Sequence, residues 1–137
     1  MTGLVVCLAV LAVAGAYGVV RQRRSGRVRV RGRDDGKRVG AAELGEALGE
    51  RATLVQFSSA FCAPCRATRR VLGEVADMVP GVRHVEIDAE HHLDLVRALD
   101  ILKTPTVLVL DAEGRVVRRA TGQPRRADVI AALGEAV

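Results

Sequence analysis

The sequence predicts an α/β domain with a mixed central sheet and helices on both faces, preceded by one apolar helix. Short apolar runs alternate with longer segments of helical periodicity, in the order β-α-β-α-β-β-α after a short first helix. The β-α-β part is typical of a parallel crossover, and the last two apolar runs flank a short turn that predicts an antiparallel hairpin. An uncharged stretch precedes all of these elements.

The uncharged stretch at residues 3–20 predicts a membrane-spanning helix, because about 17 apolar residues suffice to cross a bilayer. Met1 and Thr2 are the only residues before it, and basic residues follow it. A cleaved signal peptide usually carries its positive charge before the apolar region, so the pattern favours a permanent anchor at residues 1–20. Ala12-Val13-Ala14 resembles a cleavage site, which keeps cleavage open as the alternative.

Arginines are concentrated directly after this stretch, and residues 1–40 carry nine Lys/Arg against two Asp. The arginines are Arg21, Arg23, Arg24, Arg27, Arg29, Arg31 and Arg33. Basic residues beside a span tend to stay in the cytoplasm, so we expect the domain on that side, with the reverse topology as the alternative. Residues 21–40 then form a basic linker that is attracted to anionic lipid. Residues 41–137 carry twelve Lys/Arg against fourteen Asp/Glu and few aromatic residues, which argues against a nucleic-acid partner.

The domain is expected at residues 41–137, where a short helix at 41–48 precedes a buried strand at 53–57. The segment 65–79 predicts the strongest helix, since its apolar residues repeat on one face. These residues are Val71, Leu72, Val75, Met78 and Val79. Pro80-Gly81 ends the helix, and Val28-Arg29-Val30 in the linker predicts a short edge strand.

The second half of the domain predicts a strand at 82–87, a helix at 90–99, and strands at 106–110 and 115–120. The turn at 111–114 ends in Gly114, where a positive φ is expected. A final helix follows Pro124. It is expected to place Val129, Ile130 and Leu133 on one apolar face.

Two cysteines separated by two residues, Cys62 and Cys65, lie at the start of the strongest helix. Unpaired amide groups and the helix dipole favour negative charge there and lower the pKa of the Cys62 thiol. Pro64 suits the first turn, and Arg66 adds positive charge if its side chain turns back. Cys65 lies one turn further in and can be buried. The pattern predicts thiol–disulfide exchange, in which Cys62 attacks a target disulfide and Cys65 resolves the mixed disulfide.

A structural zinc site is the main alternative for two such cysteines, and it needs four ligands. His91 and His92 are the candidate pair, but adjacent helical residues point about 100° apart. We therefore expect no metal, with both histidines solvated and His84 on a strand facing solvent. Cys7 lies inside the predicted span and is expected to behave as a small apolar residue.

The motif Phe61-Cys62-Ala63-Pro64-Cys65-Arg66, followed later by Thr104-Pro105-Thr106, resembles the thioredoxin family. Ile87-Asp88, the turn at 111–114 and Gly122 also lie where that family has similar residues. The resemblance covers 41–137 and implies a redox-active Cys62–Cys65 disulfide with no other cofactor. It also implies a cis peptide at Thr104-Pro105 close to Cys62, with the backbone of Thr104 pairing with the substrate chain.

Three residues depart from the family pattern. Gln56 stands where thioredoxins usually have a buried Asp beneath the resolving cysteine, and a carboxamide cannot take up or release a proton at neutral pH. Phe61 replaces the usual Trp, and Ala63 replaces the usual Gly between the cysteines. These departures imply a specialised relative.

The expected function is that of a membrane-anchored thiol–disulfide oxidoreductase. It would reduce protein disulfides near the membrane and draw electrons from an upstream thiol reductant. A non-catalytic binding module with the same fold is one alternative, and Gln56 is its main support. An oxidoreductase outside the cytoplasm is the other alternative, if the topology is reversed.

Overall fold

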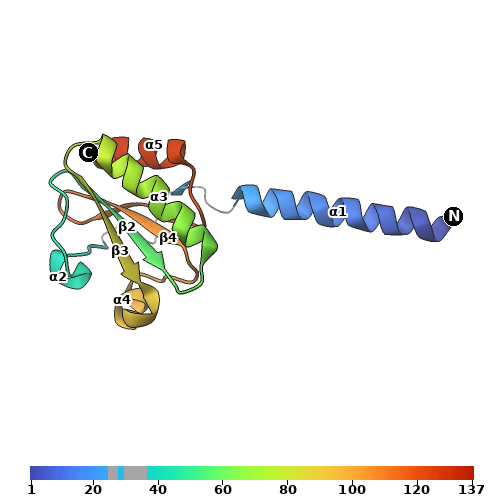
Figure 1. Cartoon of the computed structure of the whole chain (residues 1–137), viewed down its shortest axis with the longest axis horizontal. Helices are drawn as coiled ribbons and strands as arrows, with labels where there is room; N and C mark the ends of the chain where they lie inside the picture. The colour runs from blue at the N-terminus through green and yellow to red at the C-terminus, as the bar shows by residue number, and fades with distance from the viewer. Residues whose placement is uncertain (25–27, 30–36) are drawn as a thin grey trace.

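The computed structural model describes residues 1–24, 28–29 and 37–137. It consists of a long helix, α1 (Thr2–Arg24), that projects away from a layered α/β domain (Figure 1). Half of the expected linker at 21–40, including Arg27, Arg31 and Arg33, lies outside the described residues.

Helix α1 is not covered by the domain. Its large apolar side chains, such as Leu4, Leu11 and Tyr17, are exposed, and Cys7 is also exposed on it. The segment Thr2–Arg23 is long and apolar enough to cross a membrane, a description that a signal sequence near the N-terminus also fits. Because exposed apolar surface of this extent is unfavourable in water, the helix needs an apolar environment outside the domain.

The strands form one mixed sheet in the order β1-β5-β4-β2-β3. Their bounds are β1 Val28–Arg29, β2 Ala52–Ser58, β3 Val82–Asp88, β4 Thr106–Asp111 and β5 Val116–Thr121. Strands β2 and β3 are parallel, whereas the other pairs are antiparallel. This confirms the predicted mixed sheet, with β4 and β5 as the hairpin and Gly114 at φ 83° in its turn. Strand β1 confirms the short edge strand at Val28 and Arg29, and Val30 lies outside the described residues.

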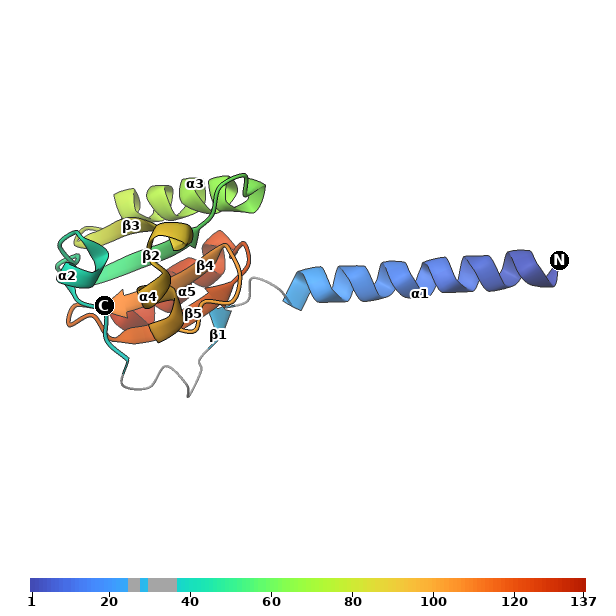
Figure 2. The same cartoon turned by 90° about the horizontal axis from the view of Figure 1, so that it is seen from below.

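Helices cover both faces of the sheet, as the sequence predicts (Figures 1 and 2). They are α2 Ala41–Leu44, α3 Ala63–Met78, the 3₁₀ turn η1 Ala89–His91, α4 Leu93–Ala98 and α5 Arg126–Ala136. Helices α3 and α5 pack on one face through Leu72, Val75 and Val129. Helices α2 and α4 contribute to a second core on the other face, around Val55 and Phe57. Both cores are almost entirely aliphatic.

Two predicted helices are shorter than expected. The helix at 41–48 ends at Leu44, because Gly45 adopts the left-handed conformation (φ 72°) that terminates helices. The helix at 90–99 is divided into η1 and α4. Asp88 caps the 3₁₀ turn with its side chain, and His92 at φ −133° interrupts the helical backbone.

The buried helix faces are narrower than predicted. Met78 is 55% exposed and Ile130 is 43% exposed, although both were expected on the apolar face. The buried stripe of α5 runs through Val129 and Leu133, four residues apart, which leaves Ile130 at its rim. The buried stripe of α3 runs through Leu72 and Val75, three residues apart, and leaves Met78 at its rim.

Candidate active site

The predicted thiol pair lies where β2 leads into α3. Cys62 and Cys65 form a disulfide with their Cα atoms 5.2 Å apart. Cys62 is the N-cap residue of α3 and is half-buried, whereas Cys65 is only 1% exposed. A disulfide or thiol partner in solvent therefore reaches Cys62 before Cys65.

The start of α3 provides hydrogen bonding to the Cys62 sulfur. The Cys65 amide donates to Cys62 Sγ over 3.2 Å, and Pro64 occupies the first turn as expected. In the reduced state this amide and the helix dipole favour the thiolate of Cys62. Arg66 is exposed, and its backbone amide donates to the Cys62 carbonyl over 3.4 Å, but in the described part of the chain no hydrogen bond or ion pair joins its guanidinium to Cys62. The helix N-terminus, rather than Arg66, thus provides the direct polar contact.

A second loop lies beside Cys62. The Thr104-Pro105 peptide bond is cis, which confirms the expectation from the sequence. Thr104 Oγ1 lies 4.0 Å from Cys62 Sγ and 2.8 Å from Ser59 Oγ. The Gly122 amide donates to the Pro105 carbonyl over 2.8 Å and fixes the loop to the end of β5. Ser59 was not identified from the sequence, because only its proximity to Thr104 distinguishes it.

Gln56 lies fully buried beneath the first turn of α3. Its Nε2 group donates to the carbonyl oxygen of Cys65 (2.8 Å) and to Ser58 Oγ (2.9 Å). Because a carbonyl accepts only, the Gln56 nitrogen must face Cys65 and its oxygen must face the other way. Gln56 is therefore a neutral support for the backbone of Cys65.

His84 lies beside the side-chain oxygen of Gln56. The expectation that His84 faces solvent is therefore wrong. His84 Nε2 lies 3.1 Å from Gln56 Oε1 and must donate, since that oxygen only accepts. Strand β3 pairs in parallel with β2 and places His84 opposite Leu54, on the face that α3 covers. Burial lowers the pKa of His84 from its usual 6.5, and the nearby Glu86 carboxylate only partly offsets this effect.

Apolar side chains surround the exposed side of Cys62. Phe61 adopts a positive φ of 58° and is fully exposed, and Ala63 is exposed in the first residue of α3. On the far side of Thr104, Leu102 is 90% exposed at the edge of a small hollow of about 280 Å³. Leu93, Val96 and Ile101 also line this hollow.

The two adjacent histidines, His91 and His92, are exposed, as expected. Both contact Asp88 through a ring nitrogen. His91 Nδ1 is 2.7 Å from Asp88 Oδ2, and His92 Nδ1 is 2.9 Å from the Asp88 carbonyl. The hydrogen bond from His91 is the main reason why the pKa of Asp88 is lowered from its usual 3.8. Within residues 1–24, 28–29 and 37–137, no three or more His, Cys, Asp or Glu side chains form a group that would hold a metal. Nothing in this geometry favours the zinc alternative.

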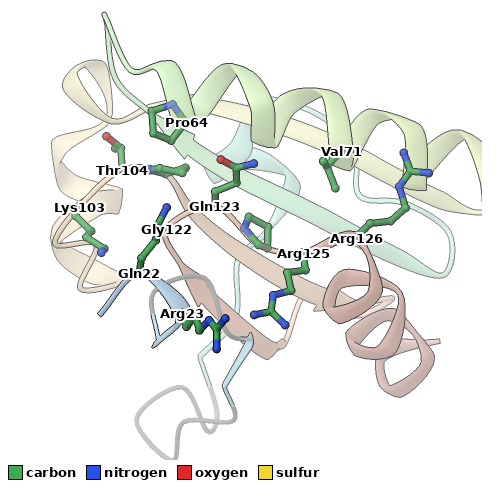
Figure 3. A pocket seen from close by; sticks show the side chains of 12 residues that line it. Gln22, Arg23, Pro64, Val71, Lys103, Thr104, Gly122, Gln123, Arg125 and Arg126 are labelled. Carbon is green, nitrogen blue, oxygen red and sulfur yellow. The ribbon is translucent and has the colours of Figure 1, made fainter. Parts of the chain in front are cut away.

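A larger groove of about 640 Å³ opens beside the cis-proline loop (Figure 3). Pro64, Thr104 and Pro105 line it on the side of the thiol pair. The remaining walls come from the end of α1 and from the segment between β5 and α5.

Comparison with known proteins agrees with this geometry. The family model described as Thioredoxin matches residues 40–135. A thioredoxin of Mycoplasma genitalium is 30% identical over 69 residues, which cover 50% of this chain and 67% of that protein. Thioredoxin H4-1 of Oryza sativa subsp. japonica is 31% identical over 84 residues, which cover 60% of this chain and 63% of that protein. The match therefore spans about two thirds of the length of these two relatives.

Solved structures show the same likeness. The crystal structure of chloroplastic thioredoxin z superimposes with a TM-score of 0.55 at 27% identity, and the match covers 63% of this chain and 78% of that chain. The matched fraction agrees with the extent of the α/β domain without α1.

Proposed function

The chain belongs to the thioredoxin family of thiol–disulfide oxidoreductases, and from this premise we propose that it is a membrane-anchored reductant of protein disulfides. One observation carries the proposal. The half-buried Cys62 caps α3 beside the Thr104-Pro105 loop, while its partner Cys65 is enclosed. Because Cys62 is the more exposed of the two, we assign it the role of attacking thiol and Cys65 the role of resolving thiol.

The proposed reaction has two exchange steps. The Cys62 thiolate attacks one sulfur of a target disulfide, so a Cys62–target bond forms and the second target sulfur leaves as a thiolate that takes up a proton. Cys65 then loses its proton and attacks the Cys62 sulfur. The Cys62–Cys65 disulfide forms, and the first target sulfur leaves and is protonated. Two electrons pass to the target, and an upstream dithiol returns them to the pair.

Gln56 and the apolar rim are proposed to support these steps. Gln56 holds the carbonyl of Cys65 but cannot accept the Cys65 proton, which must leave to water or to another group. Phe61 and Ala63 give the target an apolar surface beside Cys62, and the backbone of Thr104 pairs with the target chain. In the described part of the chain, the Thr104 amide and carbonyl make no backbone–backbone hydrogen bond, which supports this role.

The proposed organisation is an anchor at residues 1–20, a basic linker at 21–40 and the redox domain at 41–137. The exposed apolar surface of α1 supports the anchor. The arginines after it support a cytoplasmic domain and a contact with anionic lipid. Tethering restricts the domain to targets at the membrane and raises their effective concentration there.

Trapping of mixed disulfides tests the proposed reaction. Cys65→Ser removes the resolving thiol, so targets should accumulate covalently on Cys62 in membranes and be released by dithiothreitol. The wild-type chain in detergent should also catalyse the reduction of insulin by dithiothreitol. Cys7→Ser, which changes the free cysteine on α1, is the matched control and should behave as wild type.

Two results would contradict the enzyme. Absence of adducts on the Cys65→Ser variant, together with no insulin reduction by the wild type, would leave the binding module as the better description. Adducts that persist when Cys62 is also replaced by Ser would show that Cys62 is not the attacking thiol.

A further inference from the structure

The groove beside the cis-proline loop is lined by basic side chains from three separate segments. They are Arg23 at the end of α1, Lys103 before β4, and Arg125 and Arg126 at the start of α5 (Figure 3). No Asp or Glu belongs to the described lining of this groove. Since residues 41–137 are acidic overall, this positive charge is a local feature and not the consequence of a basic domain.

Most of these charges have no ion-pair partner among the residues that the structure describes. Arg126 forms an ion pair with Glu74 of α3. For Lys103 and Arg125, the described residues provide no ion-pair partner. Like charges that converge on one hollow without counterions create a positive potential, which attracts an anionic ligand.

One helix N-terminus adds to this potential. Arg125, the N-cap residue of α5, lies on a wall of the groove. Helix α5 has no side-chain hydrogen bond that caps its first amides. Free amides at a helix N-terminus favour negative charge.

The groove lies next to the reactive sulfur, and Thr104 is the residue that connects the two. Thr104 lines it and also lies 4.0 Å from Cys62 Sγ through its hydroxyl group. A polypeptide whose disulfide sulfur contacts Cys62 would therefore lay its neighbouring residues in the groove. A lipid headgroup would have no reason to be placed beside a redox-active sulfur.

We propose that the groove selects target proteins that carry acidic residues next to the disulfide to be reduced. Lys103 and Arg125 bind these carboxylates, while Arg23 extends the basic wall toward the membrane. This inference rests on the proposed function, because it names the class of substrate that the Cys62–Cys65 pair reduces. Electrostatic complementarity of this kind raises the rate of association more than it changes the chemistry.

Three disulfide peptides test the proposal. They are identical except for two residues beside one cysteine, which are Glu, Gln or Lys. The full chain, in nanodiscs of phosphatidylcholine, is reduced beforehand and mixed with each peptide, and the second-order rate constant of peptide reduction is measured. The Glu peptide should react at least about threefold faster than the Gln peptide, and the Lys peptide should be the slowest. At about 1 M salt, where the screening length is about 3 Å, the three rates should converge.

Reversing the charge of single groove residues tests whether the groove causes the preference for the Glu peptide. Lys103→Glu and Arg125→Glu should each reduce the Glu-to-Lys rate ratio, and the double variant should invert it. Arg51→Glu is the matched control, because Arg51 is an exposed arginine before β2, at the end of that strand opposite Cys62. This control should retain the wild-type ratio.

The outcomes separate this inference from the proposed function. If no peptide is reduced, the proposed function fails together with the inference. If all peptides are reduced at equal rates, the redox function stands and the acidic specificity is overturned. A Glu preference that disappears when phosphatidylserine replaces phosphatidylcholine would assign the groove to lipid headgroups and also overturn the proposal.

Discussion

At the residue scale, the two thiols of one short motif have different environments. Cys62 is half-buried at the N-cap of α3, and its sulfur accepts a hydrogen bond from the Cys65 amide. Cys65 is enclosed, and its carbonyl is held by Gln56. Since a thiolate must be both accessible and stabilised to attack, these contacts favour Cys62 as the nucleophile.

The buried Gln56 and the half-buried His84 form a polar pair beneath the motif. The hydrogen bond to the Cys65 carbonyl fixes the orientation of the Gln56 amide, which in turn requires His84 to donate through Nε2. Within the described residues, His84 is the one ionisable side chain that is hydrogen-bonded to Gln56. Gln56 thus places a neutral amide where thioredoxins usually have a buried Asp. The titratable ring of His84 is hydrogen-bonded to this amide.

The pH dependence of stability tests the half-buried position of His84. Its pKa in the folded state lies below 6.5, because burial disfavours the charged ring. Above pH 6.5 the ring is neutral in both states and contributes no pH dependence. As the pH falls through 6.5, the unfolded chain binds the proton first, so the free energy of unfolding decreases until the pH is below the folded-state pKa.

Replacement of His84 should remove this decrease. His84→Asn keeps a hydrogen-bond donor near Gln56 but does not titrate. We expect urea unfolding of the full chain in micelles, followed by circular dichroism between pH 7.5 and pH 5 (about the range that spans a histidine pKa), to show a smaller loss of stability than wild type. His92→Asn, which changes an exposed histidine away from Gln56, is the control. Equal pH slopes for His84→Asn and wild type would contradict the half-buried position of His84 against Gln56.

At the element scale, short helical segments are held in place by contacts from the sheet. Helix α4 has only six residues, and the chain leaves it through Leu99 and Asp100 toward the Thr104-Pro105 loop. Arg119 of β5 is 4% exposed and donates to the carbonyls of Leu99 (2.5 Å) and Asp100 (3.1 Å). This buried arginine therefore caps the end of α4 and anchors the segment that leads to the active-site loop.

Loss of the Arg119 contacts should destabilise the domain. Arg119→Leu leaves two buried or partly buried carbonyls without their donor, so we expect the free energy of unfolding to fall by about 1–3 kcal/mol. Urea denaturation of the full chain in micelles measures the change. Arg97→Leu is the control, because Arg97 is exposed on α4, and its effect should stay within about 0.5 kcal/mol. A similar small effect of Arg119→Leu would show that the capping contacts contribute little.

At the scale of the whole molecule, helix α1 and the α/β domain differ in where their apolar side chains lie. Those of α1 are exposed, and those of the domain are enclosed in cores. Residues 2–23 of helix α1 are not buried in the domain, whereas the domain has two aliphatic cores of its own. The end of α1 contributes Arg23 to the basic groove, so the anchor and the proposed target site meet at one place (Figure 3). Targets held at the membrane would approach this wall.

Protease protection tests the proposed orientation. In membrane vesicles of known sidedness, the domain should be digested only when its proposed cytoplasmic face is outside, because the arginines after α1 retain it on that side. The control variant moves the charge, with Thr2→Lys added and Arg21, Arg23 and Arg24 changed to Ser, and should reverse the pattern at least in part. Digestion of the wild-type domain from the outer face would contradict the cytoplasmic location.

Local features of the chain were sufficient for much of the fold. The periodicity of apolar residues predicted every strand of the sheet and the long helix α3, because these patterns reflect which side of an element faces a core. The ends of α2 and α4 were not predicted. They depend on the left-handed Gly45 and on the cap at Asp88, which compete with helical periodicity over one or two residues.

The sequence by itself determined the thiol pair at a helix start and the long apolar helix at residues 2–23, since each depends on neighbouring residues, and the resemblance to the thioredoxin family implied the cis proline. Only the tertiary structure decided that Ser59 touches Thr104, that His84 faces Gln56, and that basic residues from three segments share one groove. These contacts join positions far apart in the chain. They depend on the register of β2 with β3 and on the order of the strands, which no local pattern specifies.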